Sequence, residues 1–265
     1  MIKIAALIVI LSSCTIKGTA NTQGKLLSSD YRLFKNTPAW PLAKAVENED
    51  TSSIRKIITG HKVSVDYPDP VYGGTLLDIA VFNRKYSSVE VLLELGADPN
   101  KQNAYNKTSA LMTASRLGGG GYIHPYADSR YLKILLKYGG DPNAVQDGDR
   151  MEKRTRNYFT PLSLACISGI FEYVQILVNA GADVNFTAKD GSTPLCAGII
   201  SGNPDIVLYL LKKGANFNQI MYTTIKGEKK SVLDGINSMW HFDENSSEFK
   251  KEVEIKDFLK AHYIK

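Results

Sequence analysis

The residues that could carry out chemistry in this chain are few and widely separated. The chain has four histidines, at His61, His124, His241 and His262. Their spacing matches no pattern that would let them bind one metal ion. There is no Gly-x-Ser-x-Gly motif, and the glycine run at 118–121 lacks the lysine and hydroxyl residue that follow in a phosphate-binding loop. The sequence therefore predicts a protein that is not an enzyme and needs no metal or cofactor.

Cys14 is different, because the residues before it predict a covalent modification. Lys3 is followed by an apolar run at 4–11. The last residue of this run begins the segment Leu11-Ser12-Ser13-Cys14. The run is far shorter than the about 20 residues that span a bilayer, so we interpret it as a cleaved export signal. The last four residues resemble the lipobox of bacterial lipoproteins. This resemblance implies that residues 1–13 are removed and that Cys14 carries a lipid. An ordinary secretory signal is the alternative.

The residues after Cys14 predict where the anchored protein lies. Thr15 stands where an aspartate often retains lipoproteins at the inner membrane, so the resemblance implies the outer membrane, facing the periplasm. Residues 14–37 are mostly polar and show little periodicity. We expect them to form a flexible tether that spans on the order of 25 Å as a random coil.

The bulk composition indicates a folded body. Hydrophobic residues make up 43% of the 265 residues and charged residues 22%, which is ordinary for a globular protein. The net charge of +5 is mild and, together with export, argues against binding to nucleic acid. Three cysteines are too few for a disulfide scaffold.

Internal repeats decide the predicted fold. Thr160-Pro161-Leu162 recurs 33 residues later as Thr193-Pro194-Leu195. Gly181-Ala182-Asp183 recurs at the same offset as Gly214-Ala215-Asn216, and related segments begin at Gly96 and Gly139. A threonine can cap a helix whose first residue is proline. A glycine just past a helix adopts the left-handed conformation easily.

These motifs resemble the ankyrin repeat, in which Thr-Pro-Leu-His opens one helix and Gly-Ala-Asp follows the next. The resemblance implies an all-α solenoid of helix-turn-helix units with β-hairpin fingers. We count four clear repeats within 38–265, a degenerate N-terminal cap at about 37–66 and a degenerate C-terminal cap at about 231–265. One repeat cannot bury its own apolar face, so neighbouring repeats must stack.

Three segments interrupt the period, at 116–130, 144–158 and 239–253. The first is predicted to be a loop, although His124 and Tyr126 within it are candidates for an unrecognised active site. The second is either a solvated loop or a partner-contacting finger. In the third, Trp240 and Phe242 are expected to cover the end of the stack, with partner binding as the alternative.

Cys166 and Cys196 are expected on the first helices of adjacent repeats. We interpret them as buried, inert thiols. A disulfide between them is the alternative, although their Cα atoms could lie further apart than a disulfide permits.

The resemblance also implies how the array is used, since ankyrin arrays bind proteins through their fingers and the concave face of their first helices. The predicted fingers are 67–73, 101–107, 144–158, 186–190 and 219–230. Tyrosine and arginine are enriched at interface hot spots. The candidate partner-binding residues are Tyr67, Tyr72, Tyr105, Arg150, Arg154, Arg156, Tyr158 and Tyr222.

A lipidated binding body resembles the immunity lipoproteins that neutralise type VI secretion lipases in the periplasm. This resemblance implies a monomer, when unbound, that binds and blocks a secreted effector toxin at the membrane. The alternative is a periplasmic scaffold or protector of a resident envelope enzyme.

Overall fold

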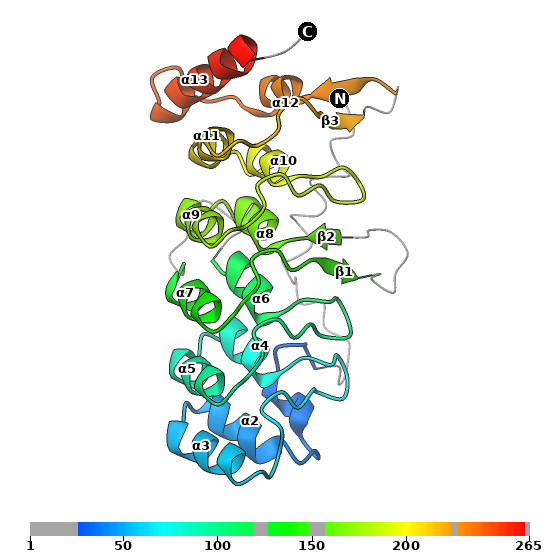
Figure 1. The fold of residues 1–265 in the computed structure, drawn as a ribbon, viewed down its shortest axis with the longest axis vertical. Coiled ribbons are helices and arrows are strands. Elements are labelled where there is room, and N and C mark those ends of the chain that lie inside the picture. The colour runs from blue at the N-terminus through cyan, green and yellow to red at the C-terminus, as the bar shows by residue number, and fades with distance from the viewer. Residues whose placement is uncertain (1–25, 119–126, 149–156, 224–226, 263–265) are drawn as a thin grey trace, which may run out of the picture.

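The computed structural model describes residues 26–118, 127–148, 157–223 and 227–262. Its helices form two parallel columns, with one helix of each pair in each column (Figure 1). The first helices are α2 (Trp40–Glu47), α4 (Leu76–Phe82), α6 (Ala110–Arg116), α8 (Pro161–Ser168), α10 (Pro194–Ile200) and α12 (Val232–Met239). The second helices are α3 (Thr51–Thr59), α5 (Tyr86–Glu94), α7 (Arg130–Lys137), α9 (Phe171–Asn179), α11 (Pro204–Lys212) and α13 (Ser247–His262). This stack confirms the predicted ankyrin-type solenoid.

The cap residues explain why the first helices begin where they do. The Thr160 and Thr193 hydroxyls accept hydrogen bonds from backbone amides three residues later, at 3.2 and 3.3 Å. Pro161 and Pro194 occupy the first helical position, as predicted. Thr75, Ser109 and Ser231 cap α4, α6 and α12 in the same way. Each cap satisfies a backbone donor that has no partner within the helix.

A ladder of asparagine side chains connects successive repeats. Asn100, Asn143 and Asn185 each donate through Nδ2 to a carbonyl in the next repeat, at 2.8, 2.9 and 3.1 Å. The Oδ1 atom of each accepts a backbone amide from that same repeat, at 2.7 Å in all three cases. Asp66 takes the equivalent place in the first unit and accepts the amide of Asp98. The same backbone geometry therefore recurs from repeat to repeat.

Glycine follows four of the second helices, α5, α7, α9 and α11, in the conformation that the sequence predicts. Gly96, Gly139, Gly181 and Gly214 have φ values between 86° and 90°. This left-handed conformation costs glycine little because glycine has no Cβ. The chain can therefore turn at the end of each of these four helices and continue into the next finger.

Among the described residues, only two fingers contain regular strands. β1 (Gln146–Gly148) pairs antiparallel with β2 (Asn157–Phe159), and β3 (Ile220–Thr223) pairs antiparallel with β4 (Lys229–Ser231). The fingers at 67–73, 101–107 and 186–190 are built from turns. The predicted β-hairpins are therefore confirmed for two of the five fingers.

Residues 26–37, which the sequence assigned to the flexible tether, pack against the body. The 3₁₀ helix η1 (Tyr31–Phe34) buries Tyr31, Leu33 and Phe34 in the core. The Leu26 carbonyl accepts a hydrogen bond from the Tyr72 hydroxyl, and the Ser29 carbonyl accepts one from Asn83 Nδ2, both at 2.8 Å. Since Tyr72 precedes α4 and Asn83 follows it, this segment runs along α4. The predicted tether is corrected accordingly for residues 26–37.

Trp240 covers the C-terminal end of the stack, as expected. The side chain is 5% exposed, and its Nε1 donates to the Ile199 carbonyl at 2.8 Å. Phe242 is half-buried beside it, with ring centroids 5.5 Å apart. Among the described residues, no helix has the length and apolarity needed to cross a membrane.

Candidate protein-binding surface

The finger at 67–73 is folded around one buried carboxylate. Asp69 is 2% exposed, and its Oδ1 accepts the backbone amides of Val71 and Tyr72 at 2.9 and 2.7 Å. Its Oδ2 accepts the Gly74 amide at 2.6 Å. A carboxylate that accepts three amides holds a short turn rigidly. Val71 is consequently held at the tip, with 59% of its surface exposed.

The next finger, 101–107, uses an asparagine for the same purpose. Asn103 Oδ1 accepts the amides of Tyr105 and Asn106 at 3.1 and 2.8 Å, while the Asn103 amide donates to the Thr108 carbonyl at 3.0 Å. Tyr105 is 47% exposed at the tip of this turn.

The two fingers are also bonded to each other. The Tyr72 carbonyl accepts the amides of Ala104 and Tyr105 at 2.9 and 3.2 Å. The Tyr72 and Tyr105 rings meet edge to face, with centroids 5.3 Å apart. Gly73 permits this approach, because a Cβ at that position would lie 2.8 Å from the Ala104 Cβ and its φ is +71°. The fingers therefore form one continuous surface.

The structure brings together only some of the predicted binding residues. The Tyr72 and Tyr105 rings touch. Tyr67 and Tyr72 are both half-buried and pack against the core. Tyr222 lies on β3, near the other end of the array, where its hydroxyl shares a hydrogen bond with Ser238 Oγ at 3.3 Å (Figure 1). Cys14, Arg150, Arg154 and Arg156 lie outside the described residues, as does the side chain of Tyr158.

Sequence reasoning missed Val71 as a surface residue and missed the contact between the two tyrosines. One signal was available for the contact, since Tyr72 and Tyr105 are 33 residues apart and thus occupy equivalent positions in consecutive repeats. It also missed Phe82, at the C-terminal end of α4, which is 53% exposed.

Asp78 on α4 is the most perturbed carboxyl of the first helices. The Thr113 hydroxyl of α6 donates to its Oδ1 at 2.5 Å. Burial raises the pKa of Asp78 to about 6, although the hydrogen bond from Thr113 and the positive charge of Arg116 both act to lower it. The hydrogen bond between Asp78 and Thr113 connects two neighbouring repeats.

The two described cysteines are unsuited to nucleophilic chemistry. Cys166 and Cys196 are both free and buried. Burial raises the pKa of each thiol, and the thiolate is the reactive form. The thiols are therefore held in the unreactive state. Within the described ranges, no cluster of histidine, cysteine and carboxylate side chains is arranged to hold a metal ion.

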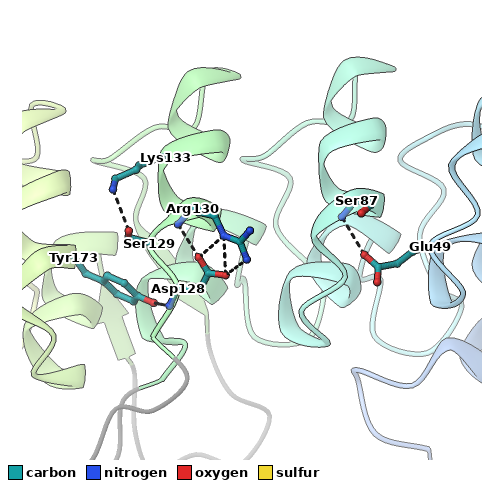
Figure 2. A network of polar contacts seen from close by, with 7 residues as sticks. All are labelled: Glu49, Ser87, Asp128, Ser129, Arg130, Lys133 and Tyr173. Atoms are coloured by element: carbon teal, nitrogen blue, oxygen red, sulfur yellow. Dashed lines mark hydrogen bonds and ion pairs between the residues drawn. The ribbon is translucent and has the colours of Figure 1, made fainter.

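A second polar network lies along the turns that precede the second helices (Figure 2). Arg130 donates to both carboxylate oxygens of Asp128, and its guanidinium lies 4.6 Å from the centre of the Tyr86 ring. The Asp128 backbone amide donates to the Tyr173 hydroxyl at 2.8 Å, and this hydrogen bond connects the segment to the next repeat. Glu49 accepts the Ser87 amide at 3.0 Å in the same manner. These contacts join neighbouring repeats and fix the segment that leads into α7.

Sequence comparison agrees with the architecture. The family model for ankyrin repeats (3 copies) matches residues 111–221, and the model for a single ankyrin repeat matches residues 72–104. Protein PhlB of Serratia liquefaciens is 33% identical over 154 residues, which cover 58% of this chain and 59% of PhlB. The KH domain-containing ankyrin protein mask-1 of Caenorhabditis elegans is 29% identical over 205 residues, which cover 69% of this chain and 7% of mask-1. The chain thus spans less than two thirds of the length of these relatives.

Comparison of structures gives the same result. The crystal structure of EF0377, an ankyrin repeat protein, superimposes with a TM-score of 0.58 and 25% identity, covering 84% of this chain and 98% of that one. Paired helices, capped first helices and the asparagine ladder recur along the described residues. This chain therefore belongs to the ankyrin-repeat family, whose stacked repeats are protein-binding arrays.

Proposed function

We propose that this chain is a lipid-anchored immunity protein that binds a secreted antibacterial effector, such as a type VI secretion phospholipase, and blocks it in the periplasm. The observation that carries the proposal is the joined finger surface in which Val71 and Tyr105 are exposed and the half-buried Tyr72 supports Tyr105 edge to face. Blocking an enzyme requires tight binding, and a surface already ordered before binding loses little conformational entropy.

The N-terminal sequence supports the location. Leu11-Ser12-Ser13-Cys14 resembles a lipobox, and several acyl chains on one cysteine would give a stable anchor. The described body begins at Leu26, only 12 residues after Cys14. Twelve residues reach at most about 40 Å even when fully extended. The body would therefore stay close to the membrane, where a phospholipase finds its substrate.

A competition experiment tests the proposal. A strain that lacks this gene is mixed with parental cells that deliver the candidate effector. We expect survival of the deletion strain to fall, and plasmid-borne full-length protein to restore it. A parental strain whose secretion apparatus is inactivated serves as the control and should not affect survival.

Equal survival of the deletion and parental strains would reject the immunity role. In that case, recovery of a resident envelope enzyme, in near-equal amount after crosslinking in intact cells, would favour the scaffold alternative.

A further inference from the structure

We infer that Val71, Tyr72, Tyr105 and Lys107 form a docking surface for an acidic protein surface that has an apolar centre. We call these four residues the first finger surface. The inference deepens the proposed function and rests on it for the nature of the partner, because it names the charge of the effector and the part of the array that receives it.

The first finger surface is ordered before any partner binds. Backbone amides of the second finger donate to the Tyr72 carbonyl, and the Tyr72 hydroxyl is held by the Leu26 carbonyl at 2.8 Å. Asp69 and Asn103 hold the two turns from within. Binding would therefore require little ordering of these residues, and rigid tyrosines provide large contact areas at low entropic cost.

The first finger surface exposes two large hydrophobic side chains to solvent. Val71 and Tyr105, which lie in adjacent fingers, are 59% and 47% exposed. Neither is required to fill the core, which is formed by the residues that face the stacked helices. Exposed apolar residues that are clustered and surrounded by polar ones are typical of protein interaction sites.

Charge specifies the partner. The five fingers, 67–73, 101–107, 144–158, 186–190 and 219–230, contain ten lysines and arginines against six aspartates and glutamates. The fingers therefore carry a net charge of +4, out of +5 for the whole chain. One of the six acids is Asp69, which is buried and bonded to amides. A basic edge of this kind attracts an acidic surface and disfavours a basic one.

Lys107 places positive charge at the first finger surface itself. It is exposed, two residues from Tyr105, and takes part in no ion pair among the described residues. The second helices differ, since Lys133 pairs with Glu172 at 3.2 Å and Lys212 with Glu254 at 3.3 Å. Lys101 is also on this finger, but its charge is close to Asp66. Lys107 is therefore available to an incoming carboxylate.

The first step of the test uses the full-length protein in intact cells. A photo-crosslinking phenylalanine analogue replaces Tyr105 and, as a matched control, the exposed Val253 of α13. We expect one protein to be crosslinked from position 105 and not from position 253, and the crosslinked segment to lie in an acidic part of that protein. A basic segment, an adduct from position 253 alone, or no adduct from either position would overturn the inference.

The second step measures binding of that protein, purified, to the full-length chain. We expect Tyr105→Ala to raise Kd by about tenfold or more. Lys107→Glu should slow association, with an effect that shrinks in 0.5 M salt because salt screens exposed charges. Lys56→Glu reverses a charge on α3, away from the fingers, and is the matched control. Unchanged binding by both finger variants would overturn the inference.

The two proposals fail separately. If the crosslinked protein is a resident envelope enzyme and the finger variants weaken its binding, the docking surface stands and the immunity role fails. If survival in competition depends on the gene but Tyr105→Ala and Lys107→Glu bind the effector normally, the immunity role stands and the effector docks elsewhere. Both variants alter exposed side chains, and circular dichroism would verify that they remain folded.

Discussion

The side chain of Asn143 accepts a hydrogen bond from the backbone amide of Asp183, which lies in the following repeat, at 2.7 Å. The Nδ2 atom of Asn143 also donates to the Gly181 carbonyl at 2.9 Å. One amide side chain thus satisfies a donor and an acceptor of the next turn. Because adjacent repeats are joined in this way several times, the array should unfold cooperatively.

Removing one step of the asparagine ladder should destabilise the protein. We expect Asn143→Ala to lower the free energy of unfolding by about 1–2 kcal/mol, since two hydrogen bonds are lost but water can reach the site. Urea denaturation followed by circular dichroism would measure this change. Asn218→Ala is the control, because Asn218 ends the ladder and its side chain makes no bond to a following repeat within the described residues. An equal loss in both variants would contradict the assignment.

Tyr173 should hold the end of the insertion that precedes α7. Tyr173→Phe removes the hydroxyl that accepts the Asp128 amide at 2.8 Å and retains the buried ring. We expect a loss of about 1 kcal/mol in the free energy of unfolding and faster hydrogen exchange at the Asp128 amide. Tyr209→Phe is the matched control, because the Tyr209 hydroxyl takes part in no hydrogen bond in the part of the chain that the structure describes. Unchanged exchange at Asp128 would show that the bond is absent in solution.

Asp78 should make stability depend on pH. Its pKa is raised by burial to about 6 in the folded protein, from a model-peptide value of 3.8. The folded state then binds more protons than the unfolded state between these values. The contribution of Asp78 is fully present below about pH 4 and is lost as the pH rises through 6.

Asp78→Asn removes this titration. Relative to the parent protein, we expect the variant to gain stability between pH 4 and pH 7, on the order of 2 kcal/mol. Denaturation of both proteins across this range would measure the difference. Asp50→Asn should give the opposite slope, because hydrogen bonds from Ser53 lower the pKa of Asp50 and its contribution is lost as the pH falls. A pH-independent difference for Asp78→Asn would mean that the carboxyl titrates normally.

Cys14 should carry the lipid. We expect Cys14→Ser to abolish incorporation of labelled palmitate and to release the protein from the membrane fraction, because serine offers no thiol for lipid attachment. Ser13→Ala preserves a small residue before the cysteine and should retain the label. Labelled Cys14→Ser protein would refute the assignment of the lipobox.

Local chemistry in the sequence determined the repeated unit. Thr160 and Thr193 cap helices, Pro161 and Pro194 occupy first helical positions, and Gly181 and Gly214 adopt positive φ, all as their spacing predicted. These preferences act within a few residues and recur every 33 positions. The helix pairs and their order could therefore be derived without coordinates.

Tertiary structure decided which residues face the same space. Residues 26–34 show no periodicity, yet Tyr31 and Phe34 are buried because the first unit offers an apolar face that needs a cover. Tyr67 and Tyr72 both pack against the core, yet only Tyr72 meets the ring of Tyr105 in the next finger among the described ring contacts. Each outcome depends on packing between segments that are distant along the chain. Local sequence preferences, which act over a few residues, cannot encode the direction in which a finger side chain points.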